Sequence, residues 1–385
     1  MSLSKSALRN FFLLAVLLEL FLMGSGRSFE IGPLTLRMVF FVTAITYSII
    51  FSISEHRADK QMFWFVIVFI LLMSLGAFIG FVNGAEPGLI LNDIKPLAYF
   101  LMIMYFYVSI KDMKTVNLTI TAIKFASFIM AFIYLLVLVL LYFNRIDYNE
   151  MYSFISNNSE EISFREDTGF FYKGFIYLCI GFIFYLFDER RIGKLIAAFI
   201  FLAIVLSFTR GLLFSTVIVI AIYMFMLKKN MKFLLYFVLF FSTIAYLTPK
   251  AIDMYGDKSE SDSVRIVTIE QVFNDVSEKS VLVGHGLGIG VSNRPEHMEI
   301  SFLEIFHKQG IVGILLWFSI LMLLVTKYFR AIQHSSPQLA LPFLLASLLV
   351  FIQSFTNPYI NNPIGMSMVL ISISALNVLG KPKYA

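Results

Sequence analysis

Long apolar runs separated by short polar segments make up most of the chain. A helix that crosses a bilayer needs roughly 20 apolar residues, because the hydrocarbon core is about 30 Å thick and a helix rises about 1.5 Å per residue. The pattern predicts an all-α polytopic membrane protein that forms a single transmembrane domain over residues 1–385. About twelve spans are expected, at residues 10–24, 34–53, 62–82, 95–110, 119–143, 169–187, 194–208, 211–227, 232–248, 311–326, 339–356 and 364–379. The two short runs on either side of Arg210 also suit a hairpin that does not fully cross, which reduces the number to eleven or ten.

The composition also indicates a membrane protein. Of the 385 residues, 59% are hydrophobic and 14% are charged, which is more apolar surface than a soluble core of this size can bury. The only cysteine, Cys179, lies inside an apolar run, so neither an internal disulfide nor a thiolate metal cluster is expected. Lys5 and Arg9 precede the first apolar run without a convincing cleavage site after it, which favours an uncleaved first helix.

The basic residues come in twos and threes between apolar runs, which fits membrane orientation better than nucleic-acid binding. With a cytoplasmic N-terminus, every inner loop is basic. The outer segment 144–167 has six carboxylates against two arginines, and 357–363 has no charge. The positive-inside rule therefore predicts that both termini are cytoplasmic. The unusual polar chemistry then falls outside, where there is no ATP, so a reaction there needs a substrate that is already activated.

Two arginines on that outer side are candidates for binding an anion. Arg210 lies between two apolar runs, and Arg265 lies near the start of a helical pattern at 261–276 that is typical of an amphipathic helix. A guanidinium group donates two parallel hydrogen bonds to phosphate, and a helix N-terminus also attracts anions. Together they would clamp a diphosphate. The alternatives are that Arg210 snorkels to the lipid phosphates and that Arg265 is simply solvated.

The segment 281–310 concentrates glycines, histidines and charges just before an apolar run. Gly284 and Gly286 belong to a glycine series that lacks the Lys-Ser/Thr of a nucleotide-binding loop, so we expect tight turns or close backbone packing instead. The histidines His285, His297 and His307 lack the HExxH spacing, and we expect neither a metal nor another cofactor.

His297 and Glu299 are the candidate catalytic residues, since either side chain can take a proton from a sugar hydroxyl. The alternative for a glutamate at this position, and for Glu304, is stabilisation of the helix start by about 0.3–1 kcal/mol. Further candidates for the site are Asp93, Lys95, Arg165, Gly284, His285, Gly286, Arg294, Glu304 and His307.

Several short segments resemble motifs of one enzyme family. They are DIKPL at 93–97, SFTRG at 207–211, Arg265 followed by GHGLG at 284–288, and EISFLEIFHKQGIVG at 299–313. With about twelve spans and one large, partly helical outer loop at 249–310, the chain resembles the O-antigen polymerase and O-antigen ligase family of bacterial surface-polysaccharide enzymes. One departure favours a polymerase: the histidine position of the ligases is occupied by Glu299, and His297 lies two residues earlier.

The resemblance implies a glycosyltransferase of GT-C-like architecture in the bacterial inner membrane, with its active site in the periplasm. Its substrate would be an undecaprenyl-diphosphate-linked oligosaccharide. Arg210 and Arg265 would bind the diphosphate, and His297 or Glu299 would act as the base in a metal-independent, inverting transfer. The partners implied are membrane lipid, a chain-length regulator and a flippase, with no nucleic acid. The alternatives are an O-antigen ligase that uses lipid A core as acceptor, a transporter or flippase for lipid-linked sugars, and a structural or partner-binding membrane protein.

Overall fold

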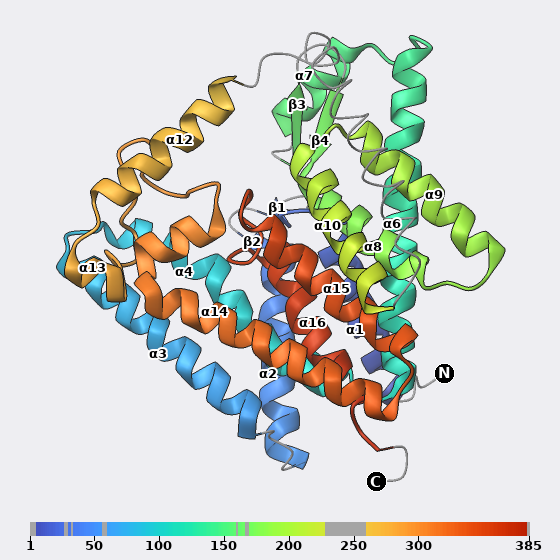
Figure 1. The fold of residues 1–385 in the computed structure, drawn as a ribbon, viewed down its shortest axis with the longest axis horizontal. Coiled ribbons are helices and arrows are strands. Elements are labelled where there is room, and N and C mark those ends of the chain that lie inside the picture. Colours follow the sequence, from blue (N-terminus) through green and yellow to red (C-terminus); the bar gives the residue numbers. More distant parts are fainter. Residues whose placement is uncertain are drawn as a thin grey trace.

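The computed structural model describes residues 5–26, 30–31, 34–55, 60–158, 161–165, 169–227 and 259–382, and it is predominantly helical (Figure 1). The N-terminal half contains α1 (Lys5–Leu22), α2 (Leu36–Glu55), α3 (Lys60–Val82), α4 (Pro87–Ala98), the 3-10 turn η1 (Tyr99–Leu101), α5 (Met102–Ser109), α6 (Met113–Tyr142) and α7 (Tyr148–Asn158). The remainder contains η2 (Lys173–Phe175), α8 (Ile176–Leu186), α9 (Arg191–Leu206), α10 (Arg210–Met226), α12 (Ser259–Asn274), α13 (Glu278–Val283), α14 (Ser301–His334), α15 (Pro337–Gln353) and α16 (Pro363–Leu379).

Two small antiparallel hairpins accompany the helices. The strands β1 (Glu30–Ile31) and β2 (Leu34–Thr35) pair with each other, and so do β3 (Ile162–Arg165) and β4 (Gly169–Tyr172). The aromatic run Phe170-Phe171-Tyr172, which we expected to begin a membrane helix, is therefore a strand. Aromatic residues favour strands, and the helix of this segment begins only at Ile176.

Four helical segments of the described chain are long and apolar enough to cross a membrane: Gln61–Val82, Pro87–Ser109, Met113–Tyr142 and Ser301–His334. Five shorter apolar helices accompany them, at Leu36–Phe51, Lys173–Leu186, Arg210–Met226, Pro337–Gln353 and Pro363–Leu379. The prediction of an all-α membrane protein is thereby confirmed. The expected span at 232–248 lies outside the described residues, and the total of about twelve stays a prediction.

The helices differ in how far other parts of the protein bury them. α16 is buried almost all round, with Met366, Val369 and Ile373 inaccessible, as expected for an apolar helix at the centre of a bundle. By contrast, α3 exposes Trp64, Phe78 and other large apolar side chains along its length. Such a surface suits contact with lipid.

Helix α14 contains a sharp break. Gly310 has φ 64° and ψ −161°, so 301–309 and 311–334 form two helical pieces that meet at a non-helical residue. A Cβ at this position would lie 2.4 Å from the backbone of Leu282, which only glycine avoids. The break redirects the short N-terminal piece, which carries Glu304 and Lys308.

The two ends of α14 and α16 have different chemistry. At their C-terminal ends, Lys327 donates a hydrogen bond to Asn377, and Arg330 packs near Gly380. At their N-terminal ends, the polar residues described below gather near α12, α13 and α4 (Figure 1). Several ion pairs therefore gather at one end of this helix pair, whereas others, such as Arg37 with Glu19 and Lys124 with Asp188, lie elsewhere in the described chain.

Candidate functional site

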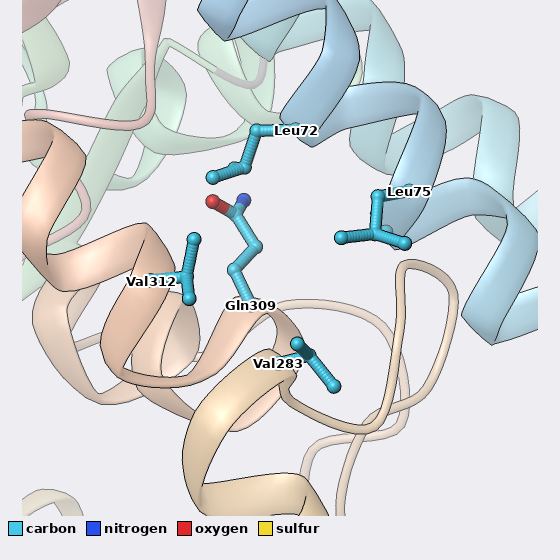
Figure 2. A pocket seen from close by; sticks show the side chains of 6 residues that line it. Leu72, Leu75, Val283, Gln309 and Val312 are labelled. Carbon is cyan, nitrogen blue, oxygen red and sulfur yellow. The ribbon is translucent and has the colours of Figure 1, made fainter.

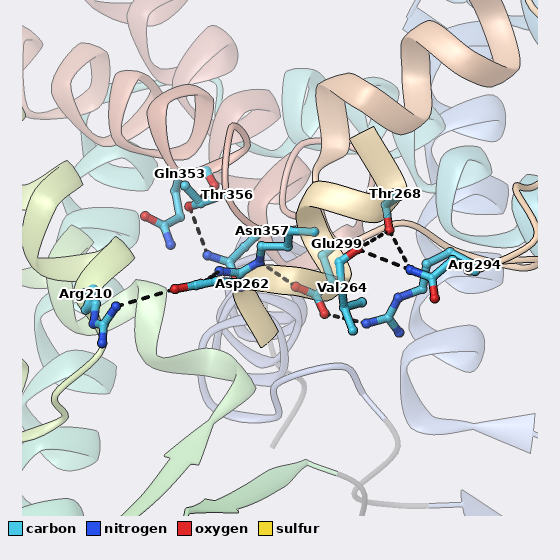
Figure 3. Close-up of polar contacts among 11 residues, drawn as sticks. Arg210, Asp262, Val264, Thr268, Arg294, Glu299, Gln353, Thr356 and Asn357 are labelled. Atoms are coloured by element: carbon cyan, nitrogen blue, oxygen red, sulfur yellow. Dashed lines mark hydrogen bonds and ion pairs between the residues drawn. The ribbon is translucent and has the colours of Figure 1, made fainter. Parts of the chain in front are cut away.

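Three arginines from separate parts of the chain lie around two carboxylates (Figure 3). The Nη1 atoms of Arg210 and Arg265 lie 3.7 and 3.5 Å from the two carboxylate oxygens of Asp262. Arg265 also donates through Nε to Glu299 at 2.7 Å. Arg294 donates through Nη2 to the other oxygen of Glu299, again at 2.7 Å. We call these five residues the arginine group.

Local structure explains why the arginine group attracts anions. Arg210 is the first residue of α10. A cation is disfavoured at the positive end of a helix dipole, which strengthens its demand for a negatively charged partner. Asp262 and Arg265 are three residues apart on α12 and therefore lie on the same face. Glu299 immediately precedes the N-cap of α14, where a negative charge is favourable.

A small pocket opens beside the arginine group. Its lining combines two guanidinium groups and a carboxylate with apolar side chains, and consists of Val264, Arg265, Thr268, Arg294, Glu299, Ile300 and Leu303. The side chains of Arg265 and Glu299 are 34% and 33% exposed, so both are within reach of a ligand. A site of this kind offers hydrogen-bond donors to an anion and apolar contact to whatever is attached to it.

Asp262 holds its two arginines weakly. Asp262 contacts Arg210 and Arg265 only at 3.5 Å or more, and it is itself more than half exposed. Exposed ion pairs of this kind contribute about 0–1 kcal/mol each. Three guanidinium charges against two carboxylates leave the group with one net positive charge. A ligand that carries two phosphates can therefore displace Asp262 at little cost.

A second group of charges, of which only His297 is exposed, is centred on Lys308 in the N-terminal piece of α14. The ammonium of Lys308 donates to Asp93 at 2.7 Å, to Glu304 at 2.8 Å and to the backbone carbonyl of Glu296 at 2.7 Å. The Nδ1 atom of His297 lies 3.4 Å from both Asp93 and Glu304. Two carboxylates are thus balanced by an ammonium and an imidazole. We call Asp93, His297, Glu304 and Lys308 the lysine group.

The glycine-containing loop between α13 and α14 fastens the lysine group to α3 and α4. The N–H of Gly288 donates to Asp93 at 2.6 Å. Gly286 has φ 97°, and a Cβ there would lie 2.1 Å from the backbone nitrogen of Gly80 on α3. The glycines, Gly284 included, thus allow close backbone packing at positive φ rather than forming a nucleotide loop.

Three potential metal ligands meet in the lysine group. The ligand atoms of Asp93, His297 and Glu304 all lie within 4.8 Å of one another. The cation between the two carboxylates in this structure is the ammonium of Lys308, at 2.7 and 2.8 Å from their oxygens. A divalent ion would have to displace this ammonium from the position it fills.

His297 is held in its protonated form at neutral pH. The carboxylates of Asp93 and Glu304 raise its pKa from 6.5 to about 9. Because the pKa of the folded state lies above the ordinary value, His297 contributes stability that is fully present below about pH 6.5. That contribution is lost as the pH rises through about 9.

Replacing His297 is therefore expected to flatten the pH dependence of stability. In detergent, the midpoint of thermal unfolding of the wild type should fall between pH 6.5 and 9.5, because His297 loses its proton over that range. His297→Gln should show a smaller fall. His334→Gln serves as the control, because that histidine is exposed at the far end of α14. Equal slopes for the wild type and His297→Gln would contradict the role of this imidazolium.

The turn between α15 and α16 connects to the lysine group. The side chain of Asn361 donates to Glu304 at 2.6 Å and accepts from the hydroxyl of Ser301 at 2.9 Å. The same hydroxyl lies 3.0 Å from the backbone carbonyl of Asn357. The uncharged segment 357–363 attracted no functional prediction from the sequence, since its neutral residues give no charge signal.

Several predicted site residues lie apart from both groups. Lys95 is exposed on α4, about 200° around the helix from Asp93. His307 is buried, and its ring stacks on that of His285 with the centroids 4.5 Å apart. The backbone of Arg165 belongs to β3, and its side chain lies outside the described part. Arg210, Arg265, Arg294 and Glu299 come together in the arginine group, and Asp93, His297 and Glu304 in the lysine group.

A second depression lies where α3, α13 and α14 meet (Figure 2). The carboxamide of Gln309 points across it toward Leu72. The other lining residues are Leu75, Gly76, Val283 and Val312. Its lining carries no charge, so it is a poor site for an anionic ligand.

Fold and site together define a multi-pass, all-α membrane protein with an arginine-rich polar site at one end of its helices. No family model matches the chain. Over 375 residues, the chain is 28% identical to an O-antigen polymerase of Shigella flexneri, and the alignment covers 94% of this chain and 93% of that protein. The resemblance to the O-antigen polymerases is thereby confirmed along nearly the whole chain.

Proposed function

We propose that the chain polymerises repeat units of O-antigen, or of a related surface polysaccharide, that are linked to undecaprenyl diphosphate. The observation that carries the proposal is the convergence of three guanidinium groups, from α10, α12 and the loop before α14, on one accessible site. A planar guanidinium suits phosphate because it donates two parallel hydrogen bonds. The 28% identity to an O-antigen polymerase over 94% of the chain supports the same function.

The protein would lie in the inner membrane with both termini in the cytoplasm and its site in the periplasm. The basic residues Lys327 and Arg330, at the opposite end of α14 from the site, support this orientation. Segment 249–310 would be a periplasmic loop, and the whole would form a GT-C-like bundle of about twelve spans. A flippase that delivers repeat units and a chain-length regulator are partners that this function implies.

The transfer itself breaks one bond and forms another. The acceptor hydroxyl of one repeat unit attacks the anomeric carbon that joins the growing glycan to its lipid diphosphate. The new C–O bond forms with inversion, while the electron pair of the old bond leaves with the diphosphate. Arg210, Arg265 and Arg294 would stabilise this developing negative charge, which is the electrostatic role that a metal ion fills in other enzymes.

Glu299 is the group that we propose as the base. Its two oxygens accept hydrogen bonds from Arg265 and Arg294. When these arginines turn toward the diphosphate, the carboxylate becomes free to accept the proton of the attacking hydroxyl. His297 is less suited to this role, because its pKa of about 9 leaves it already protonated at neutral pH.

Reconstitution tests this function directly. The purified protein in liposomes, supplied with undecaprenyl-diphosphate-linked repeat units, should produce a ladder of lengthening glycans on a gel. Transfer only onto added lipid A core would identify a ligase instead. Movement of the substrate across the bilayer without elongation would identify a flippase. Either result would overturn the proposal.

Asp262 is expected to compete with the diphosphate for Arg210 and Arg265. Asp262→Asn should therefore bind undecaprenyl diphosphate about three- to tenfold more tightly, because removing two contacts that together contribute about 1 kcal/mol frees the arginines. Glu270→Gln removes the same charge from an exposed position on α12 and is the matched control. The affinity of each variant for undecaprenyl diphosphate is measured with the protein in nanodiscs. An unchanged affinity for Asp262→Asn would show that this carboxylate does not occupy the ligand position.

A further inference from the structure

Neutral polar side chains from the C-terminal end of α15 and the turn that follows it face Gly211, the residue after Arg210. A Cβ on Gly211 would lie 2.8 Å from Nε2 of Gln353, 3.2 Å from Oγ1 of Thr356 and 3.3 Å from Nδ2 of Asn357. Figure 3 shows these three side chains on the same side of the arginine group as Arg210 and Asp262. Two carboxamides and a hydroxyl therefore surround the second residue of α10. We call Gln353, Thr356 and Asn357 the amide group.

Gln353 has an unused hydrogen-bond donor. Its oxygen accepts a hydrogen bond from the hydroxyl of Ser215 at 2.8 Å. Its Nε2 atom is buried and donates no hydrogen bond within the described chain. A buried donor without an acceptor is unfavourable, and it indicates a place where an oxygen atom of a ligand would be stabilising. Thr356 and Asn357 are half-buried beside it and remain within reach of a ligand.

The turn that carries the amide group is held firmly. Besides the contacts of Ser301 and Asn361 to Asn357 and Glu304, the N–H of Ile360 donates to the hydroxyl of Ser354 at 3.0 Å. Asn362 caps α16 by accepting from the N–H of Ile364. Binding groups on a preorganised backbone lose little freedom when a ligand arrives.

The amide group has the chemistry of a sugar site. Carboxamides and hydroxyls both donate and accept hydrogen bonds, as sugar hydroxyls require, and they carry no charge that would attract phosphate. Arg210, whose guanidinium belongs to the arginine group, directly precedes Gly211 in the chain. We propose that Gln353, Thr356 and Asn357 form the subsite for the sugar attached directly to the lipid diphosphate, next to the arginines that bind the diphosphate itself. This inference rests on the proposed function.

A substitution at Gly211 can fill the subsite while changing little elsewhere in the protein. In Gly211→Ala the new methyl group would press on the flexible end of the Gln353 side chain and occupy the space beside Thr356 and Asn357. Alanine also favours a helix more than glycine does, so α10 should form normally. Gly88→Ala is the matched control, because Gly88 is likewise the second residue of its helix and a Cβ there meets nothing within 4 Å.

Comparing two ligands distinguishes binding at the sugar subsite from binding at the diphosphate site. Undecaprenyl diphosphate without sugar and the same lipid with its repeat unit are titrated against the protein in nanodiscs. Gly211→Ala and Thr356→Val should each bind the glycosylated lipid about tenfold more weakly, the loss of one or two hydrogen bonds. Their affinity for the bare lipid diphosphate should stay within about twofold of the wild type, because the arginines are untouched. Gly88→Ala should bind both ligands as the wild type does.

Ser215→Ala separates ligand binding from packing. It removes the hydrogen bond between Ser215 and Gln353 but leaves all three members of the amide group in place. Ser215→Ala should therefore weaken the binding of the glycosylated lipid less than Gly211→Ala does. If Gly211→Ala and Thr356→Val weaken the binding of both ligands equally, or of neither, the proposal of a sugar subsite is wrong while the proposed function stands. If the wild type binds neither lipid, the proposed function fails and the subsite with it.

Discussion

Lys308→Met is expected to destabilise the protein by about 3–5 kcal/mol, because it leaves two buried carboxylates without their cation. The side chains of Lys308, Asp93 and Glu304 are only 3%, 5% and 7% exposed. Asp93 and Glu304 would then repel each other in a region of low dielectric, with only His297 to balance them. The midpoint of thermal unfolding in detergent and the amount of protein in the membrane should both fall sharply.

Two variants make this prediction specific. Lys327→Met also removes a buried lysine, but the Lys327 ammonium donates to the neutral carboxamide of Asn377, so we expect a much smaller loss. The double variant Lys308→Met/Glu304→Gln removes one of the two buried charges and should recover part of the lost stability. Equal losses for Lys308→Met and Lys327→Met would mean that burial of the side chain, and not the charge balance of the lysine group, determines the effect.

Arg265→Lys is expected to lower the rate of glycan elongation by about 100- to 1,000-fold, the usual effect of removing one donor that stabilises developing charge. Arg265 contacts Glu299 through Nε and Asp262 through Nη1. An ammonium cannot reproduce this fork, although it keeps the charge. The rate is measured with reconstituted protein and lipid-linked repeat units, and the protein level should remain that of the wild type.

Arg190→Lys controls for the general effect of losing a guanidinium. Arg190 makes a comparable two-pronged contact with Asp188, at 2.9 and 2.8 Å, but in the connection between α8 and α9 and with its side chain 78% exposed. Elongation by Arg190→Lys should match the wild type. Normal elongation by Arg265→Lys would remove this arginine from the binding of the diphosphate.

Apolar patterning predicted most of the helices, because a membrane span leaves a simple signal in one stretch of sequence. Helix α16 coincides closely with the apolar run 364–379, and α6 contains nearly all of the run 119–143 but begins six residues earlier, at Met113. The strand β4 was missed because its aromatic residues satisfy a hydropathy criterion as well as a helix does. The break at Gly310 was also missed, since a single glycine within an apolar pattern does not reveal its backbone angles.

Residue chemistry allowed us to predict that Arg210 and Arg265 act together, but not that Asp262 lies between them. Asp93 and Lys308 are 215 positions apart, and nothing in a single sequence pairs them. Lys308 was therefore absent from the predicted site, although it holds the lysine group together. Gln353 and Thr356 were absent for a different reason: neutral polar residues near a helix end are common, and they become informative only when Gly211 is seen to face them.

The carboxylates of Asp262 and Glu299 also bear on selectivity within a crowded bilayer. Phospholipid headgroups, each with a single phosphodiester charge, greatly outnumber any polysaccharide carrier around the protein. Bare guanidinium groups would attract them continually. Because Asp262 and Glu299 already neutralise most of that positive charge, a lone phosphodiester gains little by replacing them. If the site binds a diphosphate as proposed, a pyrophosphate gains more because of its greater charge. Competition with Asp262 and Glu299 would then select it over the more abundant phospholipids.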